Sequence, residues 1–371
     1  MRPGRYAYFV TVGVCLAFGQ FARASGNFNI TIQPDGGLAA NSDALAAFNR
    51  AADEWSSHIT SAFPVNIIIK ADMVNLGFTN VIGQTTFTGD PTVWNQPYDL
   101  VRNAMAARSN RPGNSILASL PTQAQISAHV PDSFVFNNQQ VNYTFDSQHI
   151  GILRANQKAL GILGPSNPTY NSPDGIIEFN TLFNFDYRGN VVDPSKMDFQ
   201  TVAAHEIGHV LGFTSDVDDF DFSVSSAASL TDDLTTLDMF RFNANELPTA
   251  ANFATAPREL RPGQASFTYD LTNKYAMSTG NYNGDGHQAS HWQDDEENGI
   301  HVRPLVGIMD PTLDFGAIET VQDSDLRAME LIGYDTSPAA VPEPACLALF
   351  GFASIVLLTR RRHFPNLESA A

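Results

Sequence analysis

The sequence lacks cysteine over most of its length. Its 371 residues include only two cysteines, Cys15 and Cys346, which lie in the first and last segments of the chain. Disulfide bonds therefore cannot stabilise residues 25–340, and a cysteine-based inhibitory switch is excluded there. This region must rely on its own hydrophobic core, and its length suits one large domain or two lobes.

Basic residues are also scarce. The chain has 21 Lys and Arg against 39 Asp and Glu, a formal net charge of -18. Arginines at both ends account for part of the basic total, so residues 25–340 are more acidic still. Such a surface repels phosphate backbones, and we expect no nucleic-acid partner. Its carboxylates are the ligand type that Ca²⁺ prefers, so calcium is a candidate second cofactor.

Long hydrophobic runs are confined to the two ends. At the start, Arg2 and Arg5 precede an apolar stretch at 9–18 and the small-x-small sequence Ala22-Arg23-Ala24. This order is typical of a cleavable secretory signal, here residues 1–24. A buried N-terminal helix is the less favoured alternative, because basic residues and a cleavage site flank a run too short to span a bilayer.

The C-terminal end has three parts in a fixed order. Pro342-Glu343-Pro344 is followed by apolar or small residues at 345–359 and then by Arg360 to Arg362. This arrangement resembles the PEP-CTERM sorting tail of Gram-negative bacteria. The resemblance implies recognition by exosortase-type machinery and delivery to the cell envelope or the extracellular space. Residues 341–362 would be the sorting or anchor segment and 363–371 a cytoplasmic tail; an ordinary single-span anchor is the alternative. Membrane contact is expected only through this segment.

Between the ends, the pattern first favours helices mixed with strands. Residues 43–60 carry apolar side chains at helical spacing, 64–73 are strand-like, and 174–185 predict a strand followed by a bend. Asp198 is a candidate N-cap for the next helix, and Gly212 stands where a C-cap glycine would. These features predict an α+β N-terminal lobe at residues 25–212.

The pattern changes after residue 212. Residues 213–290 are polar and acidic, and Asp216, Asp218, Asp219 and Asp221 predict a solvated or calcium-binding loop. Residues 323–335 predict a last amphipathic helix that stops at Gly333. The C-terminal lobe, 213–340, is therefore expected to be rich in loops and to end in a helix.

The strongest chemical signal is His205-Glu206-Ile207-Gly208-His209. Residues four apart lie on one face of a helix, so both imidazoles can reach a single zinc ion. Glu206 would then contact the zinc-bound water and serve as its general base. An incidental pair of histidines on a surface helix is the alternative, but the apolar, capped context disfavours it.

The motif continues to Gly212, three residues after His209, and in this it resembles the metzincin clan of zinc peptidases. That clan usually places its third ligand three residues after the glycine, where this chain has Ser215. The usual pattern is therefore broken, and a third ligand has to come from elsewhere in the chain.

Two later strings supply a candidate. Ser290-His291-Trp292 and Gly307-Ile308-Met309-Asp310-Pro311 follow the helix motif after a long insertion. This order is similar to that of leishmanolysin-type metzincins. The resemblance implies that His291 is the third zinc ligand and that Met309 forms the methionine turn beneath the metal. It also implies a twisted sheet and an active-site helix in the N-terminal lobe, with one catalytic zinc at the base of a cleft between lobes.

Other assignments remain open. His287 lies four residues before His291, and Asp216 lies near the usual ligand position. A zinc peptidase of another clan would use a downstream glutamate such as Glu246 or Glu259. Met309 could also be an ordinary core methionine.

The combined expectation is a secreted zinc metalloendopeptidase that hydrolyses internal bonds of extracellular or envelope proteins. Its partners would be protein or peptide substrates. The alternative is a non-catalytic surface or matrix protein that keeps zinc for structure. A fourth protein ligand would distinguish a structural site, because a catalytic site leaves that position to water.

Overall fold

The computed structural model describes residues 27–336 except 88–93 and 298–299. The predicted signal at 1–24, the sorting segment at 341–362 and the tail at 363–371 lie outside the described residues. Within them, no helix is both long and apolar enough to cross a membrane. The predicted α+β class is confirmed, since helices and strands are mixed along the chain.

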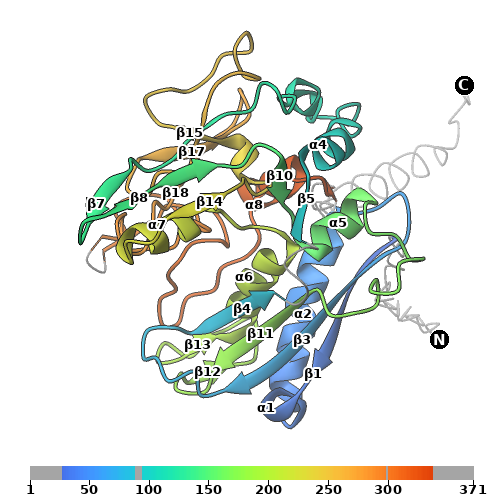
Figure 1. The fold of residues 1–371 in the computed structure, drawn as a ribbon. Helices are drawn as coiled ribbons and strands as arrows, with labels where there is room; N and C mark the ends of the chain where they lie inside the picture. The colour runs from blue at the N-terminus through green and yellow to red at the C-terminus, as the bar shows by residue number, and fades with distance from the viewer. Residues whose placement is uncertain (1–26, 88–93, 298–299, 337–371) are drawn as a thin grey trace, which may run out of the picture.

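The lower half of the molecule is built on a sheet of four strands in the order β1-β3-β11-β4 (Figure 1). Strands β1 (Phe28–Pro34), β3 (Val65–Val74) and β11 (Gly175–Asn180) run parallel to one another. Strand β4 (Gly83–Phe87) pairs antiparallel with β11 and forms one edge. The strands predicted at 64–73 and 174–185 are thus the two central ones.

Two helices pack against each other and against this sheet, α2 (Ser42–His58) and α6 (Phe199–Leu211). In α2, Phe48, Ala52 and Trp55 form the apolar stripe that the spacing predicts, and all three are buried. The indole Nε1 of Trp55 donates to the backbone oxygen of Ala204, 2.7 Å away, which joins α2 to the middle of α6.

An aromatic cluster closes the space between these helices and the sheet. The ring of Phe179 lies 5.3 Å from that of Phe48 and 4.3 Å from that of Phe199, measured between centroids. All three side chains are fully buried. The cluster fixes the start of α6 against the central strand β11.

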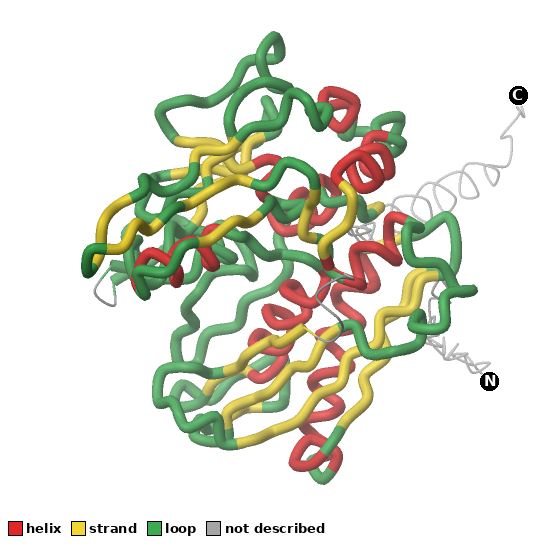
Figure 2. The backbone as a smooth tube through the Cα atoms, viewed as in Figure 1, coloured by secondary structure: helices red, strands yellow, loops and turns green. Residues whose placement is uncertain are grey.

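The upper half consists of short elements joined by long loops (Figure 2). A three-stranded sheet, β15-β17-β18, is its largest unit, and its other strands pair in twos. The elements of this half are β5 (Asn95–Pro97), α4 (Tyr98–Ala106), η1 (Ser115–Ser119), β6 (Ala128–His129), β7 (Phe134–Phe136), β8 (Gln139–Val141), β9 (Tyr143–Phe145), β10 (His149–Gly151), α7 (Val217–Ser225), β14 (Leu230–Asp232), η2 (Asp238–Phe240), β15 (Arg241–Asn243), β16 (Arg258–Glu259), β17 (Ser266–Tyr269) and β18 (Lys274–Met277).

Small elements complete the described chain. They are α1 (Gly36–Ala39), β2 (Ile59–Thr60), α5 (Arg154–Leu160), β12 (Phe185–Asp186), β13 (Met197–Asp198), α8 (Asp323–Leu331) and β19 (Asp335–Thr336). Helix α8 lies within the helix predicted at 323–335. The chain turns at Gly333, whose φ is +111°, and a Cβ there would lie 2.3 Å from Cδ2 of Leu160.

The two hydrophobic cores are not divided at residue 212, where the lobe boundary was predicted. One core contains α2, the main sheet and α6, and also residues 306–334. The second core joins residues 98–152 to residues 217–260. The upper lobe, defined here as 94–152 and 216–291, is therefore built from two separate stretches of chain. Local patterns could not reveal this, because apolar contacts between distant segments decide it.

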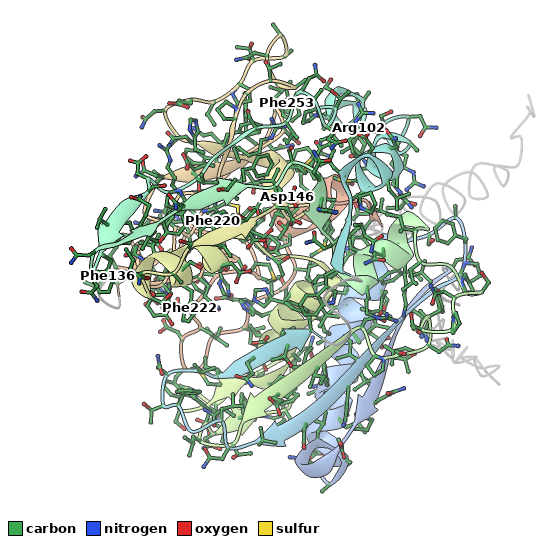
Figure 3. All side chains as sticks on the ribbon, in the orientation of Figure 1. Arg102, Phe136, Asp146, Phe220, Phe222 and Phe253 are labelled. Atoms are coloured by element: carbon green, nitrogen blue, oxygen red, sulfur yellow. The ribbon has the colours of Figure 1, made fainter. Side chains whose placement is uncertain are left out.

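A second departure concerns the acidic stretch after residue 215. The sequence predicted a loop there, but residues 217–225 form helix α7. Val217 and Phe220 are fully buried at helical spacing, and Figure 3 shows Phe220 within the upper lobe. Burial of this apolar face explains why an acid-rich segment is helical.

Candidate metal centre

Helix α6 carries the two histidines and the glutamate of the sequence motif. It begins as predicted at Asp198, whose side chain accepts a hydrogen bond from the backbone nitrogen of Thr201 at 2.9 Å. It ends at Gly212, which has a left-handed φ of +119°. A Cβ on Gly212 would lie 3.0 Å from Cδ1 of Ile332, so this sharp exit needs glycine.

Three imidazoles converge at one point beside this helix. The Nε2 atoms of His205 and His209 are 3.2 Å apart, and Nε2 of His291 lies 3.1 Å from the first and 3.2 Å from the second. His291 thus returns to the helix pair across a gap of more than eighty residues in sequence, as the delayed-ligand hypothesis requires.

The other ring nitrogen of each histidine meets a backbone carbonyl. Nδ1 of His205 lies 2.8 Å from the oxygen of Ile308, and Nδ1 of His209 lies 2.8 Å from that of Phe213. Nδ1 of His291 lies 3.1 Å from the oxygen of Gln288. A carbonyl can only accept, so each Nδ1 carries the proton and each Nε2 presents a lone pair to the centre.

Burial keeps these rings neutral. Desolvation lowers the pKa of His205 to about 4 and, with repulsion from its neighbour, that of His209 to about 3. The pKa of His291 is lowered well below its ordinary value for the same reasons. Three neutral imidazoles with converging lone pairs are unfavourable alone and favourable around a cation.

The arrangement fits zinc. Bonds of 2.0–2.1 Å at tetrahedral angles separate ligand nitrogens by about 3.3 Å, close to the separations between the three Nε2 atoms. Among the described residues, only these three potential ligands gather at this point. Nitrogen ligands with carbonyl partners behind them suit zinc better than calcium or magnesium.

Glu206 lies beside the histidines and is 5% exposed. Its Oε2 accepts a hydrogen bond of 2.7 Å from Oγ1 of Thr85 on the edge strand β4. Burial raises the pKa of Glu206 to about 7, and the Thr85 hydroxyl opposes that shift. A Cβ on Gly83 would lie 2.8 Å from Oε1 of Glu206. Glycine at this position of β4 therefore leaves room for the carboxylate against the strand.

Met309 packs directly against α6. A Cβ added to Gly208 would lie 2.3 Å from the sulfur of Met309, so the glycine between the two motif histidines is needed for this contact. Met309 is fully buried, and its neighbour Ile308 accepts the Nδ1 proton of His205. The 307–311 string therefore supports the histidine cluster through both a side chain and a backbone oxygen.

Asp325 on α8 holds this turn in place. Its carboxylate accepts from the indole of Trp292 at 2.7 Å and from the backbone nitrogen of Ile308 at 2.8 Å. A Cβ on Gly307 would lie 2.3 Å from it. Burial raises the pKa of Asp325 to about 6, and these hydrogen bonds oppose the rise. One carboxylate thus links the His291-Trp292 pair to the methionine turn.

Asp218 on α7 holds the other side of His291. It accepts from the backbone nitrogens of Ala289 and Ser290, at 2.5 and 3.0 Å, and from the Ser290 hydroxyl at 2.5 Å. That hydroxyl in turn accepts from the backbone nitrogen of Ser215. Ser215, which stands at the usual third-ligand position of the motif, therefore helps to position the segment that carries His291.

The rival ligands lie elsewhere. Nε2 of His287 is 3.0 Å from a carboxylate oxygen of Asp294. Asp216 gathers with other carboxylates in the upper lobe. Glu246 contacts His129, and Glu259 pairs with the guanidinium of Arg261. None of these side chains joins the cluster formed by His205, His209 and His291.

A cleft of about 1010 Å³ passes over the cluster. One wall is the edge strand β4, and the opposite wall comes from the upper lobe, including Phe222, which Figure 3 places on the side that faces the sheet. Asp218, Asp325 and Thr85 are site residues that sequence reasoning missed. Only Asp325 had a local signal, as the N3 residue of a capping box whose N-cap is Gln322.

Comparison of the chain with protein-family models and with curated proteins finds no match.

Proposed function

We propose that the chain is a secreted zinc metalloendopeptidase, of metzincin-like fold and leishmanolysin type, that hydrolyses internal peptide bonds of extracellular or envelope proteins. The observation that carries the proposal is the convergence of three Nε2 lone pairs beside a buried glutamate, in the wall of an open cleft. His205, His209 and His291 would hold the ion. Zinc bound there would supply Lewis-acid activation of a water molecule and of the scissile carbonyl.

The number of ligands favours catalysis over a purely structural role. Structural zinc sites in proteins close with four side-chain ligands, whereas catalytic sites use three and leave one position to water. Three gather here among the described residues. A purely structural zinc site would also not explain why Glu206 is buried beside the histidines. Burying a carboxylate is unfavourable, so its burial there calls for a function.

Glu206 is the general base of this proposal. The Thr85 hydroxyl orients one carboxylate oxygen, which leaves the other to take the proton of the attacking water. A pKa close to the working pH suits a group that first accepts a proton and then delivers it to the leaving amine.

Substrate would bind along β4. Among the described residues, this strand is the edge of the sheet and pairs with β11 alone. An extended peptide can add to such an edge through backbone hydrogen bonds, which places its carbonyls beside Glu206 and the histidines. Recognition through the backbone is what an endopeptidase acting inside a chain requires.

Location is part of the same proposal. The signal at 1–24 would direct export, and the PEP-CTERM-like segment would engage exosortase-type machinery at the envelope of a Gram-negative bacterium. Intact-mass measurement of the extracellular protein should show that the first 24 residues are absent. Recovery of Met1 on that form would refute the export signal.

The activity is tested by Glu206→Gln. Removing the proton acceptor while leaving the ligands should retain near-stoichiometric zinc and lower the rate of peptide cleavage by about 10²–10⁴-fold or more. Metal analysis and a peptide-library assay on purified protein measure the two effects. Wild-type turnover in this variant, or wild-type protein that binds zinc and cleaves no peptide, would rule out the proposed mechanism.

A further inference from the structure

We propose that Asp216, Asp232 and Asp233 form a calcium site in the upper lobe. One carboxylate oxygen from each residue lies within 4.8 Å of the other two, although the residues come from two segments, the start of α7 and the end of β14. The group lies next to Asp146, whose backbone nitrogen donates to the oxygen of Asp232 at 2.7 Å and whose position Figure 3 marks.

Two oxygens of this group have no hydrogen-bond partner. Oδ2 of Asp233 and Oδ2 of Asp216 are both inaccessible to solvent and unpaired. Asp233 as a whole is 3% exposed. A buried carboxylate oxygen without a donor is strongly unfavourable, because it has lost its hydrogen bonds to water and forms no hydrogen bond within the protein. Both oxygens belong to carboxylates of this one group, and a bound cation would satisfy both.

Neighbouring carboxylates in the same lobe differ in this respect. Asp221 accepts from the backbone nitrogens of Tyr282 and Asn283. Asp238 accepts from Ser215, Thr235 and the backbone nitrogen of Asp216. These side chains are satisfied by protein donors and need no ion, so a general excess of acid does not account for the unpaired oxygens.

Among the described residues, the charged groups with the strongest influence on Asp216, Asp232 and Asp233 are other carboxylates. Burial and this mutual repulsion raise the pKa of Asp232 to about 6 and that of Asp233 to about 7. A divalent cation would remove the repulsion that the folded chain otherwise has to bear.

The ligand set favours calcium. Carboxylate oxygens suit hard cations, whereas zinc prefers nitrogen and sulfur. Mg²⁺ is usually held by one or two carboxylates and keeps several waters, whereas three carboxylates match the larger number of protein ligands that Ca²⁺ takes. Gly151 lines the site, since a Cβ there would lie 3.3 Å from Asp233 and 3.5 Å from Asp216. Asp232 is partly exposed and leaves room for water ligands.

The site would support the third zinc ligand. Asp216 begins α7, and Asp218 on the same helix holds Ser290 beside His291. Tying α7 to β14 through an ion therefore steadies the segment that carries His291. This link rests on the proposed function, whereas calcium binding itself does not.

The test uses the purified chain, depleted of metal and reloaded with one equivalent of zinc. Calorimetric titration with CaCl₂ at pH 7.5 should show one ion bound per chain with a Kd at or below about 1 mM. At 100 times that Kd, the Tm should rise by about 5 °C. Asp233→Asn and Asp232→Asn should each lose most of this response, and neither should lower the Tm in the absence of calcium. Asp132→Asn, an exposed carboxylate of the same lobe, is the matched control and should respond like the wild type.

The failures are distinguishable. Absence of calcium binding by wild-type protein would mean that the carboxylates share protons instead, and it would overturn the proposal. Unchanged calcium affinity in both variants would place the ion elsewhere and overturn it equally. If Asp233→Asn does not fold, Asp232→Asn decides the matter. His291→Ala should keep the calcium response, so loss of the zinc site and loss of the calcium site give separate results.

Discussion

Different interactions stabilise the two lobes. The lower lobe buries apolar faces of long regular elements, such as the 10-residue β3 and the 17-residue α2. The upper lobe has strands of only two to four residues, and buried carboxylates that accept backbone N–H groups fix its irregular segments. The candidate metal centre takes two histidines from the first region and one from the second. Its geometry therefore depends on hydrogen bonds to carboxylates as much as on apolar packing.

The largest effect on zinc affinity is expected at the upper-lobe ligand. His291→Ala removes the only ligand outside α6, and two imidazoles on one helix cannot complete a tight site. Zinc affinity should fall by more than the ~10–100-fold that loss of an outer hydrogen-bond partner costs. Competition with a chromogenic chelator measures it.

His287→Ala is the control for that experiment. Its ring pairs with Asp294 and lies outside the histidine cluster, so zinc affinity should remain near the wild-type value. A larger loss of zinc in His287→Ala than in His291→Ala would mean that the third ligand is wrongly assigned.

An intermediate effect is expected from the carboxylate that positions this ligand. Asp218→Asn weakens the contacts to Ala289 and Ser290, so zinc affinity should fall by about 10–100-fold while the ligands themselves stay intact. Asp219→Asn changes the adjacent, exposed carboxylate and should have little effect. Equal zinc affinity in the two variants would show that apolar packing alone holds His291.

The smallest effect on zinc affinity is expected in the lower-lobe core. Phe179→Ala removes a ring that contacts Phe48 and Phe199 and should lower the free energy of unfolding by about 3–5 kcal/mol. Chemical denaturation measures this loss. The folded variant should nevertheless bind zinc as the wild type does, because the lost contact is to the start of α6, whereas His205 and His209 lie in its middle and its last turn. Reduced zinc affinity in the folded fraction would show that packing in the lower-lobe core also controls the geometry of the histidine cluster.

The same contrast explains what the sequence could reveal. The helices α2 and α6, the strands β3 and β11, and the caps at Asp198 and Gly212 follow from local periodicity and capping chemistry, because the lower lobe is regular. The proximity of His291 to the helix pair followed from a resemblance and not from any local pattern.

The upper lobe was harder to predict for a physical reason. Its residues at 98–152 join residues 217–260 through contacts between distant segments, which no periodicity records. Helix α7 was missed because the acidic side chains at 216–221 suggested a loop, whereas Val217 and Phe220 carried the helical signal. Asp218 was predicted to lie in a solvated or calcium-binding loop, although its carboxylate accepts hydrogen bonds from the segment before His291.

The three Nδ1 contacts have a consequence for how the folded chain would take up metal. Because each ring already donates its Nδ1 proton to a carbonyl and has a pKa well below 7, no proton has to leave the three imidazoles when an ion arrives. Metal uptake at histidine sites ordinarily competes with protonation of the ligands and weakens as the solution becomes acidic. Here the proton released on zinc binding between about pH 5 and pH 7 should come from Glu206, whose pKa of about 7 a neighbouring cation would lower. Calorimetry in buffers of different ionisation enthalpy should therefore detect proton release in the wild type and almost none in Glu206→Gln.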